Sequence, residues 1–345
     1  MKSKLDIARE IINDVDEKML KLFKERMEAA RMVAEYKKEN NLPILDSGRE
    51  EAIISKNLNA LNDEDLEEYY LTFFGGVLAA SKDYQKDLNK KHYALIGEKL
   101  GHSYSPLIHN TIFDKLKINA SYSLIEANRE DLEEIINKLR NGIYSGFNVT
   151  VPYKKDIIQY IDELSPEAKA IGSVNTIALV EGKVVGYNTD YYGFYNTVVH
   201  NGIDVKNKDC YILGTGGASL AVKRALNDLG ANVYTVSRTP KGDELSYDEL
   251  NDKDIYLMVN TTPVGMYPHT GVSPVSRGIA LKPRYTIDII FNPQYTQFLL
   301  DSRSSINGLD MLVGQALKAE EIWQNQRIDI DYLNLLKEIE LIVYE

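Results

Sequence analysis

The chain has 345 residues, of which 44% are hydrophobic and 26% charged, so it can bury a sizeable core and is not disordered throughout. Its 40 basic and 51 acidic side chains give a formal net charge of −11, and no nucleic-acid partner is expected because such a partner needs a cationic surface. The single cysteine, Cys210, excludes an internal disulfide and a cysteine zinc site.

About the first 85 residues are predicted to be entirely helical. Between Leu5 and Lys38 there is no proline or glycine, and apolar residues recur at helical spacing, which predicts one helix of about 34 residues. Ser47 and Glu50 have the spacing of a capping box, so a second helix is predicted after Ser47, and a third from Asp63 to about Lys86. The first helix is too long to cover its own apolar stripe, which predicts a partner, most simply a second copy of the chain.

A polar joint at residues 87–91 separates this segment from the rest, where short β-rich runs alternate with helical ones. Strands are predicted from Tyr93, Ser121 and Gly146, and helices between them from Pro106 and Arg129. This alternation predicts a mostly parallel α/β sheet.

A second α/β unit begins at Asp209, where an apolar strand leads into the turn Gly214-Thr215-Gly216-Gly217-Ala218-Ser219 and then a helix. Further strands are predicted from Asn232, Asp254 and Tyr285. Glycines let the backbone approach a pyrophosphate and a helix N-terminus favours the anion, so the turn is a candidate dinucleotide site. The motif alone is weak, because Ser219 stands where a third glycine or alanine belongs, and an ordinary tight turn is the alternative.

The strand after the glycine turn ends in Ser237-Arg238-Thr239, without the acidic residue that holds the ribose of NAD. A guanidinium is planar and permanently charged, so it suits a phosphate. The sequence therefore predicts NADP as the cofactor; the alternative is that Arg238 is a solvated surface residue.

From about His92 onward the chain closely resembles the shikimate dehydrogenase family. The resemblance rests on ordered motifs: Gly101–Pro106 (GHSYSP), Asn148–Lys154 (NVTVPYK), Val174–Thr176 (VNT), Asn188–Asp190 (NTD), the glycine turn, Ser237–Thr239 (SRT) and Gly314–Ala316 (GQA). It implies reversible, NADPH-dependent reduction of 3-dehydroshikimate to shikimate, with an α/β substrate-binding domain and a Rossmann NADP-binding domain.

The resemblance also implies a role for each motif. Lys154 and Asp190 become the catalytic pair, and Ser103 and Ser105 hold the substrate carboxylate. The residues implied to contact the substrate hydroxyls and orient the ring are Asn148, Thr150, Asn175 and Gln315. Those implied to bind NADP are Gly214, Gly216, Gly217, Ala218, Ser237, Arg238 and Thr239. Hydride delivery to a ketone builds negative charge on its oxygen, and the sequence leaves open whether Lys154 protonates that oxygen or mainly stabilises its charge.

Taken singly, these residues have ordinary structural alternatives. Lys154 could lie in the first turn of a helix, and Asp190 and Ser105 could be helix N-caps. His102 and His109 are interpreted as structural hydrogen-bonding residues, and Cys210 as a small buried hydrophobe.

Phe291 departs from the family pattern, in which a tyrosine at this position contributes a hydroxyl near the substrate carboxylate. A phenyl ring cannot donate a hydrogen bond. This leaves the affinity for shikimate open, as well as the use of quinate.

The N-terminal segment resembles the all-helical class of chorismate mutase. The resemblance rests on nearly colinear polar positions: Arg9, Asp16-Glu17-Lys18, Glu25-Arg26, Lys37, Asp46, Arg49-Glu50 and Gln85. The implied reaction, chorismate to prephenate, needs no nucleophile; the enzyme holds a folded dicarboxylate and stabilises charge growing on its ether oxygen. By resemblance, Arg9, Arg26 and Arg49 bind carboxylates, Asp46 and Glu50 contact the hydroxyl region, and Lys37 and Gln85 are the catalytic groups at the ether oxygen.

Helix geometry separates Arg9 from the other residues of this set. At ~100° per residue, Arg26 and Lys37 lie about 20° apart around the helix, whereas Arg9 is ~100° from Arg26. Arg9 is therefore predicted to reach the partner's site in a homodimer formed through the helical domain, as the resemblance also implies. The alternative for all these charges is a solvated helix face.

Together these features predict a bifunctional cytoplasmic enzyme of aromatic amino-acid biosynthesis, with small-molecule substrates and no metal. No membrane partner is expected, because no apolar run approaches ~18 residues. The expected domains are a helical mutase domain at 1–88, a substrate-binding domain at 92–190 completed by about 308–345, and a Rossmann domain at 191–307. The alternative is that the helical domain binds chorismate or prephenate without catalysis, as a regulatory or dimerising module.

Overall fold

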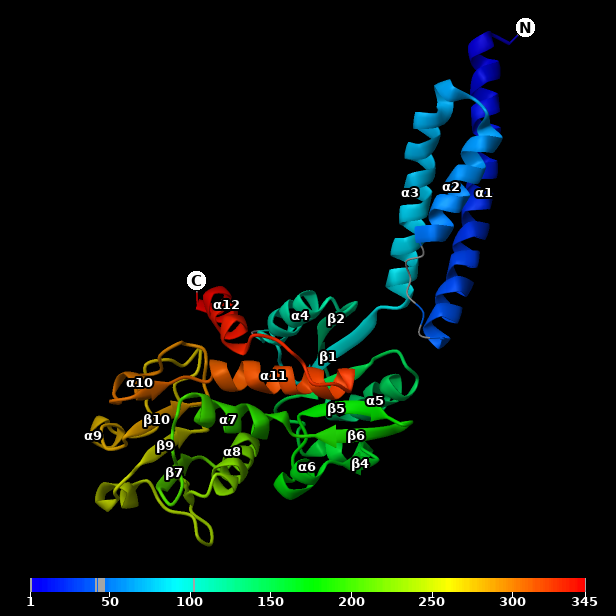
Figure 1. Ribbon diagram of the computed structural model, residues 1–345. Coiled ribbons are helices and arrows are strands. Elements are labelled where there is room, and N and C mark those ends of the chain that lie inside the picture. The colour runs from blue at the N-terminus through cyan, green and yellow to red at the C-terminus, as the bar shows by residue number, and fades with distance from the viewer. Residues whose placement is uncertain (1, 41, 43–46, 102, 345) are drawn as a thin grey trace. The chain divides into compact units, whose positions relative to one another are not determined.

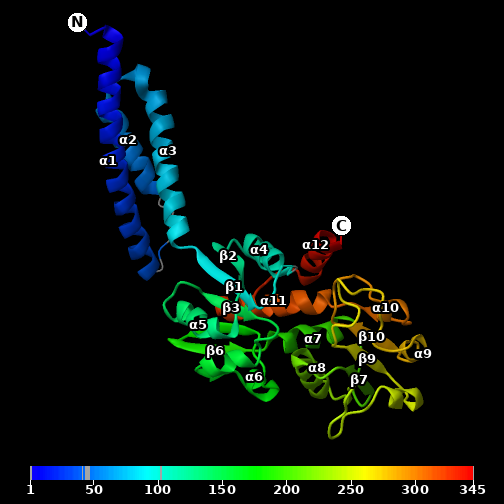
Figure 2. The same cartoon turned by 180° about the vertical axis from the view of Figure 1, so that it is seen from behind.

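The computed structural model describes residues 2–40, 42, 47–101 and 103–344. The chain divides into two compact units, Met1–Lys91 and His92–Glu345. The first is all-helical and the second is α/β (Figures 1 and 2), as the sequence predicted.

The first unit consists of α1 (Lys4–Glu39), α2 (Ser47–Leu61) and α3 (Glu64–Leu88), which run side by side in both views (Figures 1 and 2). The predicted helices are confirmed to within about two residues at each end. Ser3 caps α1 in a capping box with Asp6, and Asp63 caps α3. The box predicted at Ser47 and Glu50 depends on the side chain of Ser47, which lies outside the described part of the chain.

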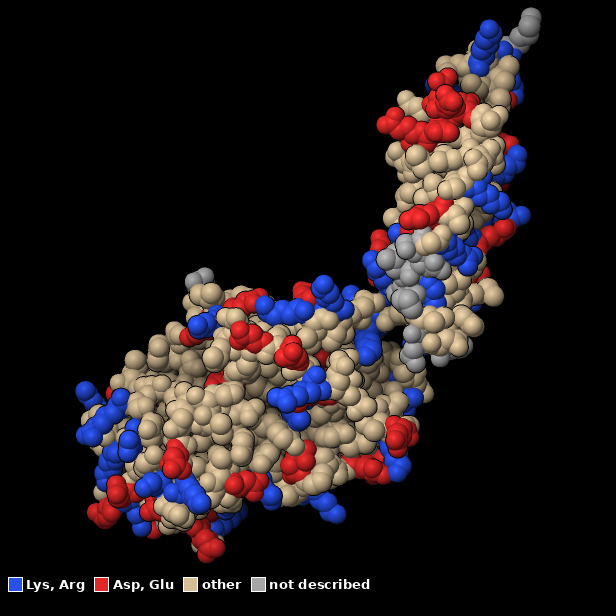
Figure 3. All heavy atoms as spheres, in the orientation of Figure 1, with Lys and Arg blue, Asp and Glu red and all other residues tan. Residues whose placement is uncertain are grey.

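The apolar face of α1 is largely uncovered within this unit. Ala30 and Ala34 are buried, whereas nine large apolar side chains nearer the N-terminus are exposed: Leu5, Ile7, Ile11, Ile12, Val15, Met19, Leu20, Leu22 and Phe23. Much of the visible surface of the unit is uncharged (Figure 3). So much exposed apolar surface on a single helix is typical of an interaction site.

The second unit contains a six-stranded sheet in the order β2-β1-β3-β5-β6-β4. Its strands are β1 (Lys91–Gly97), β2 (Ala120–Glu126), β3 (Gly146–Val149), β4 (Glu163–Leu164), β5 (Thr176–Val180) and β6 (Lys183–Tyr187). The sheet is mixed rather than mostly parallel, because β5 runs antiparallel to both β3 and β6. Glu181 and Gly182, with φ of 51° and 79°, form the two-residue turn that joins β5 to β6, a turn type that requires positive φ at both positions.

Helices α4 (Ser105–Leu116), α5 (Leu132–Arg140) and α6 (Pro166–Ile171) accompany this sheet. The apolar stripe of α5 is buried in a cluster that includes Ile96 and Phe147 from the central strands β1 and β3. This packing fixes the carboxyl ends of β1 and β3, from which several of the predicted substrate-binding residues follow.

The second sheet has the order β11-β10-β9-β7-β8, and its described strand pairs are all parallel, as predicted. Its strands are β7 (Asp209–Leu213), β8 (Asn232–Val236), β9 (Leu257–Asn260), β10 (Tyr285–Asp288) and β11 (Ser305–Ile306). Helices α7 (Thr189–His200), α8 (Gly217–Asp228), α9 (Arg277–Ala280) and α10 (Gln297–Leu300) accompany this sheet. The chain ends in α11 (Leu309–Gln324) and α12 (Tyr332–Tyr344), and α12 packs with α4 and α11. Helix α11 packs on α7 and also reaches α4 and β5, so it links the two sheets.

The ion pair between Arg140 and Asp162 provides a test of stability in this unit. Nη1 and Nη2 of Arg140 donate to Asp162 Oδ2 and Oδ1 at 2.7 and 2.8 Å, and Val184 N donates to Oδ2 at 2.8 Å. The pKa of Asp162 is lowered to about 2, mainly by the hydrogen bonds from the Arg140 guanidinium and secondly by the one from the Val184 amide.

We expect Asp162→Asn to lower the free energy of unfolding at pH 7 by ~1 kcal/mol, a value reduced because the pair is about a third exposed. A lowered pKa contributes stability that is lost as pH falls through it, so the difference from wild type should shrink from about pH 4 to pH 2. Urea unfolding at several pH values measures this. Glu163→Gln, which removes a more exposed pair with Lys183, is the control and should change stability less; an equal loss in both variants would contradict the account.

Candidate active sites

Lys154 and Asp190 form a largely buried ion pair in the second unit. Lys154 lies in the turn between β3 and a short 3-10 helix, and Asp190 lies in the first turn of α7, whose N-cap is Asn188. The alternatives of a first-turn helix lysine and an N-cap aspartate are therefore both wrong. Lys154 Nζ donates to Asp190 Oδ2 at 2.5 Å, and their side chains are only 17% and 11% exposed. An ammonium held by such a carboxylate can stabilise negative charge on a nearby oxygen.

Asn175 and Gln315 lie within the same hydrogen-bond network as this pair. Asn175 Nδ2 donates to Asp190 Oδ1 at 2.9 Å, and its Oδ1 accepts from Thr189 N at 2.6 Å. Thr189 Oγ1 in turn donates to Gln315 Oε1 at 3.3 Å. Four of the predicted residues, from four different chain segments, are thus brought together.

Asn148, the next predicted residue, is fixed on both sides of its amide. Nδ2 donates to Asn175 O at 3.2 Å and to Thr176 Oγ1 at 2.9 Å, and Oδ1 accepts from Tyr122 OH at 2.7 Å. Asn148 is 4% exposed, so its orientation is set by these contacts. Thr150 follows on the same strand end, where its backbone amide donates to Ile96 O.

Ser103 and Ser105 lie at the start of α4. Ser105 N donates to Ser103 Oγ at 3.3 Å, which places the two residues side by side. Ser105 is the first residue of the helix and Tyr104 is its N-cap, without a side-chain capping bond, so the N-cap alternative for Ser105 is wrong. His102 lies outside the described residues. His109 is a buried hydrogen-bonding residue, as predicted, with Nδ1 2.6 Å from Glu320 Oε1.

The glycine turn is tight and leads directly into helix α8. Gly214 has φ of +109°, and a Cβ there would lie 2.9 Å from Thr262 Cγ2, so a side chain at this position would be strained and crowded. Gly216 is the N-cap of α8, and Gly217 and Ala218 open that helix. Ser219, the departure from the motif, is accommodated because its hydroxyl donates to Gly216 O at 2.7 Å. Open backbone at a helix N-terminus fits the pyrophosphate of NADP.

Arg238 lies beside this turn. Leu213 and Val236 are paired at the carboxyl ends of β7 and β8, and Gly214 N donates to Val236 O at 2.9 Å. Ser237 is nearly buried, whereas Arg238 and Thr239 are exposed. An exposed guanidinium next to the glycine turn fits the ribose phosphate of NADP, as the sequence predicted.

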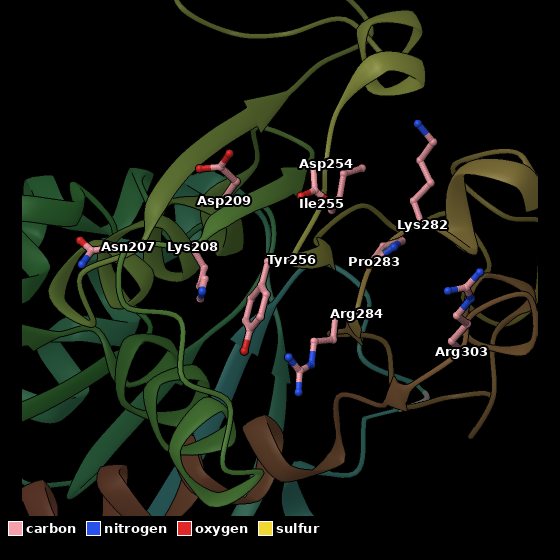
Figure 4. A pocket seen from close by; sticks show the side chains of 10 residues that line it. All are labelled: Asn207, Lys208, Asp209, Asp254, Ile255, Tyr256, Lys282, Pro283, Arg284 and Arg303. Carbon is pink, nitrogen blue, oxygen red and sulfur yellow. The ribbon is translucent and has the colours of Figure 1, made fainter.

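A hollow of about 560 Å³ lies at the opposite end of the same sheet (Figure 4). Its ten lining residues, among them Lys208, Tyr256 and Arg284, precede or begin β7, β9, β10 and β11. Ligands of open α/β sheets bind at the carboxyl ends of the strands. The hollow is therefore not the cofactor site, although both belong to one sheet.

Other chemistries receive no support from the part of the chain that the structure describes. Cys210 is buried in β7, and burial raises the pKa of its thiol to about 12, so it is no nucleophile. Among the described residues, no three His, Cys, Asp or Glu side chains gather as a metal site, and no helix is both long and apolar enough to cross a membrane.

Arg26 is the centre of a second candidate site, in the helical unit. Its Nε donates to Ser81 Oγ at 3.2 Å, and its guanidinium carbon lies 5.6 Å from the centre of the Phe74 ring. Ser81 is buried and Phe74 lies about two turns before it on the same helix, α3. A guanidinium held in this way against α3 is suited to a carboxylate ligand.

Glu50 and Gln85 place further polar groups on α2 and α3. Lys82 Nζ donates to Glu50 Oε2 at 3.1 Å, with both side chains about a third exposed or less. Gln85 Oε1 is buried and has no hydrogen-bond partner among the described residues. A buried amide oxygen without a partner is costly unless a donor on a ligand completes it. Lys37 lies on α1 and Arg49 on α2, whereas Asp46 lies outside the described residues.

Arg9 lies far from this group on the same helix. Seventeen residues of α1 separate it from Arg26, or about 25 Å at ~1.5 Å per residue. Arg9 is exposed. It therefore cannot share a ligand with Arg26 of the same chain.

A parallel sheet with a glycine turn, joined to a domain that carries a largely buried lysine–aspartate pair, is typical of a dinucleotide-dependent dehydrogenase. A family model for the shikimate dehydrogenase substrate binding domain matches residues 95–177, and one for chorismate mutase type II matches residues 8–86. The chain belongs to the shikimate dehydrogenase family, with a chorismate mutase domain in front.

Individual relatives agree with this assignment. Shikimate dehydrogenase (NADP(+)) of Clostridium beijerinckii is 45% identical over 251 residues, which cover 69% of this chain and 93% of that protein. A solved chorismate mutase/shikimate 5-dehydrogenase fusion protein from Clostridium acetobutylicum is 39% identical with a TM-score of 0.71, and the match covers 73% of this chain and 98% of that one. Shikimate 5-dehydrogenase from Thermus thermophilus, solved with NADP(H) and shikimate, is 29% identical with a TM-score of 0.66, over 72% and 97% of the two chains.

Two residues at these sites were missed in the sequence. Ser81 contacts Arg26, and it lies four residues before Gln85, one turn away on the same helix face. That spacing was a usable signal. Tyr122 contacts Asn148 across 26 residues of sequence, and nothing local to Tyr122 indicates that partner.

Proposed function

We propose that this chain is a bifunctional enzyme whose second unit reversibly reduces 3-dehydroshikimate to shikimate with NADPH and whose helical unit converts chorismate to prephenate. The observation that carries the first activity is the Lys154–Asp190 pair, whose Nζ and Oδ2 atoms are 2.5 Å apart and whose carboxylate accepts from Asn175. Gln315 belongs to the same network through Thr189. The second activity, chorismate conversion, is supported by Arg26, Ser81, Glu50 and Gln85, which lie on the three helices of one unit.

In the dehydrogenase, NADPH supplies the hydride when it is bound. Ser103 and Ser105 hold the substrate carboxylate, and Asn148, Thr150, Asn175 and Gln315 orient the ring through its hydroxyls. Lys154 faces the carbonyl oxygen and stabilises the charge that grows there, while Asp190 holds the ammonium in place. The pair thereby acts on the transition state more than on the bound ketone.

In the mutase, the protein's task is to hold a dianion in a folded conformation. Arg26 and Arg49 bind carboxylates, Glu50 and Asp46 contact the hydroxyl region, and Lys37 and Gln85 donate to the ether oxygen. An amide and an ammonium can both donate at neutral pH, so the reaction needs no protonated acid. The rate gain comes from orientation and charge stabilisation.

The mutase site is completed by a second copy of the chain. The exposed apolar residues of α1 require a cover, and Arg9 lies about 25 Å from Arg26 along the helix. A two-fold homodimer through the helical domain (residues 1–88) satisfies both, since it brings the partner's arginine to this chain's site. The remaining domains are a substrate-binding domain (92–190 with about 308–345) and an NADP domain (191–307), in a cytoplasmic enzyme.

The choice of cofactor is tested by Arg238→Ala. A charge-assisted contact to the ribose phosphate is worth ~1.5–3 kcal/mol, so the Michaelis constant for NADPH should rise about 10- to 150-fold. That for NADH should change far less. Steady-state kinetics with both cofactors measures this, and a wild-type enzyme that used NADH equally well would overturn the assignment of Arg238.

The missing family hydroxyl is tested by Phe291→Tyr. The Phe291 ring is partly buried and makes an edge contact with Tyr104, their centres 5.7 Å apart. Restoring the hydroxyl should lower the Michaelis constant for shikimate by about 2- to 10-fold, the value of one hydrogen bond. An unchanged or higher constant would mean that the site is rebuilt around the phenyl ring, with Tyr295 as the candidate substitute donor.

Both activities can be assayed on the full-length chain. NADPH oxidation should depend on 3-dehydroshikimate, and chorismate should be consumed without NADPH. If the folded wild-type protein lacks one of the two activities, that half of the proposal is wrong.

A further inference from the structure

A buried acid–base pair in the dehydrogenase unit has no part in the mechanism above. His109 on α4 and Glu320 on α11 are both fully buried, and His109 Nδ1 lies 2.6 Å from Glu320 Oε1. Gln324 Nε2 donates to the other Glu320 oxygen at 3.3 Å, and His109 Nε2 has no hydrogen-bond partner among the described residues. Such pairs add little stability compared with apolar residues of the same size. The location of this one suggests what it does.

The imidazole of His109 lies flat on the ring of Tyr122, with ring centres 4.1 Å apart and planes 2° from parallel. The Tyr122 hydroxyl donates to Asn148 Oδ1 at 2.7 Å. The pKa of Tyr122 is raised well above its ordinary value, chiefly by burial and also by the Glu320 charge, while a hydrogen bond with the Ser105 side chain opposes the rise. One phenol therefore joins the buried pair to two residues assigned to the substrate, Ser105 and Asn148.

We propose that His109 and Glu320 are positioning residues for shikimate binding, acting through Tyr122 on Asn148 and Ser105. The Glu320 carboxylate accepts from His109 Nδ1 and so fixes the rotation of the imidazole. The imidazole fixes the plane of the Tyr122 ring, and the hydroxyl of that ring fixes which end of the Asn148 amide is the acceptor. This proposal rests on the assignment of Asn148 and Ser105 to the substrate.

Two variants separate this chain of contacts from general packing. Tyr122→Phe removes only the hydroxyl, and Glu320→Gln removes the charge but keeps the shape. Each should raise the Michaelis constant for shikimate by about 2- to 12-fold, the value of one misplaced hydrogen bond. The turnover number and the Michaelis constant for NADP⁺ should stay within about twofold of wild type, because substrate binding alone is altered.

The double variant tests whether the two residues act along one path. If they do, the combined rise should be close to the larger single effect rather than the product of the two. Tyr93→Phe is the matched control. Tyr93 is buried in the same region, accepts from Gln324 Nε2 at 3.2 Å and stacks on Trp323. Gln324 also links it to Glu320, at the carboxylate oxygen that does not face His109, but no described contact joins Tyr93 to Asn148 or Ser105. It should lose thermal stability without a change in shikimate binding.

The proposal is overturned if folded Tyr122→Phe or Glu320→Gln binds shikimate normally, if their effects multiply, or if Tyr93→Phe raises the constant as much. Circular dichroism and thermal unfolding establish folding in each case. Asn148→Ala distinguishes the underlying assignment. If Asn148→Ala binds shikimate normally, the assignment of Asn148 to the substrate is wrong, and the positioning role is lost with it. If Asn148→Ala is impaired while Tyr122→Phe and Glu320→Gln are not, only the positioning role is overturned.

Discussion

Lys154→Ala should abolish reduction of 3-dehydroshikimate while leaving the rest of the protein functional. The loss of a group that protonates or stabilises the developing oxyanion costs about 10²- to 10⁴-fold in turnover. The Michaelis constant for shikimate should change less, because the ammonium acts mainly in the transition state. NADPH binding and chorismate conversion should be close to wild type, since the glycine turn and the helical unit are separate from Lys154.

The neighbouring Lys155 provides the control for this variant. Lys155 is exposed, and no ion pair links it to Asp190. Lys155→Ala should therefore retain near-normal turnover. Titration of NADPH by fluorescence and steady-state rates on both variants make the comparison. Near-normal turnover in Lys154→Ala would remove this residue from the catalytic role and leave Asp190 without the partner on which its own role depends.

The shared mutase site is tested by complementation between two inactive variants. Arg9→Ala and Arg26→Ala should each be nearly inactive, because each leaves one carboxylate of the dianion without its guanidinium. Unfolding and refolding the two together should restore activity. Random pairing makes about half of the dimers mixed, and each mixed dimer has one doubly altered site and one intact site, so about a quarter of all sites are wild type.

Arg31→Ala is the matched control on the same helix. Arg31 is engaged by Glu28 and Glu35 of α1, and it should be dispensable for chorismate conversion. Recovery of about a quarter of the wild-type rate in the mixture supports the crossing of Arg9 between chains. If dimers have exchanged and no activity returns, Arg9 does not complete the partner's site, and the crossing model is wrong.

Much of the fold could be predicted from sequence because the signals are local. The long helix α1 follows from a run without proline or glycine, and the parallel second sheet from strands that alternate with helical segments. The glycine turn and Arg238 could be placed together because carboxyl ends of neighbouring parallel strands share one edge of a sheet.

The rest depends mainly on contacts between segments that are distant in the sequence. The hairpin of β5 and β6 was not predicted, although Glu181-Gly182 between two β-rich runs is a local signal for it. The partnership of His109 with Glu320 spans 211 residues, and no periodicity or spacing could have indicated it. The N-cap alternatives for Asp190 and Ser105 were wrong because Asn188 and Tyr104 precede the helices there, a difference of one or two residues that sequence patterns do not resolve.

The central claim, two activities on one chain, is tested most directly by assaying both on the purified full-length protein and on two single variants. Wild type should oxidise NADPH only in the presence of 3-dehydroshikimate and should convert chorismate to prephenate without cofactor. Lys154→Ala should lose only the first activity and Arg26→Ala only the second. A folded wild-type protein that reduces 3-dehydroshikimate but leaves chorismate unchanged would contradict the account, and the helical unit would then be a binding or dimerising module.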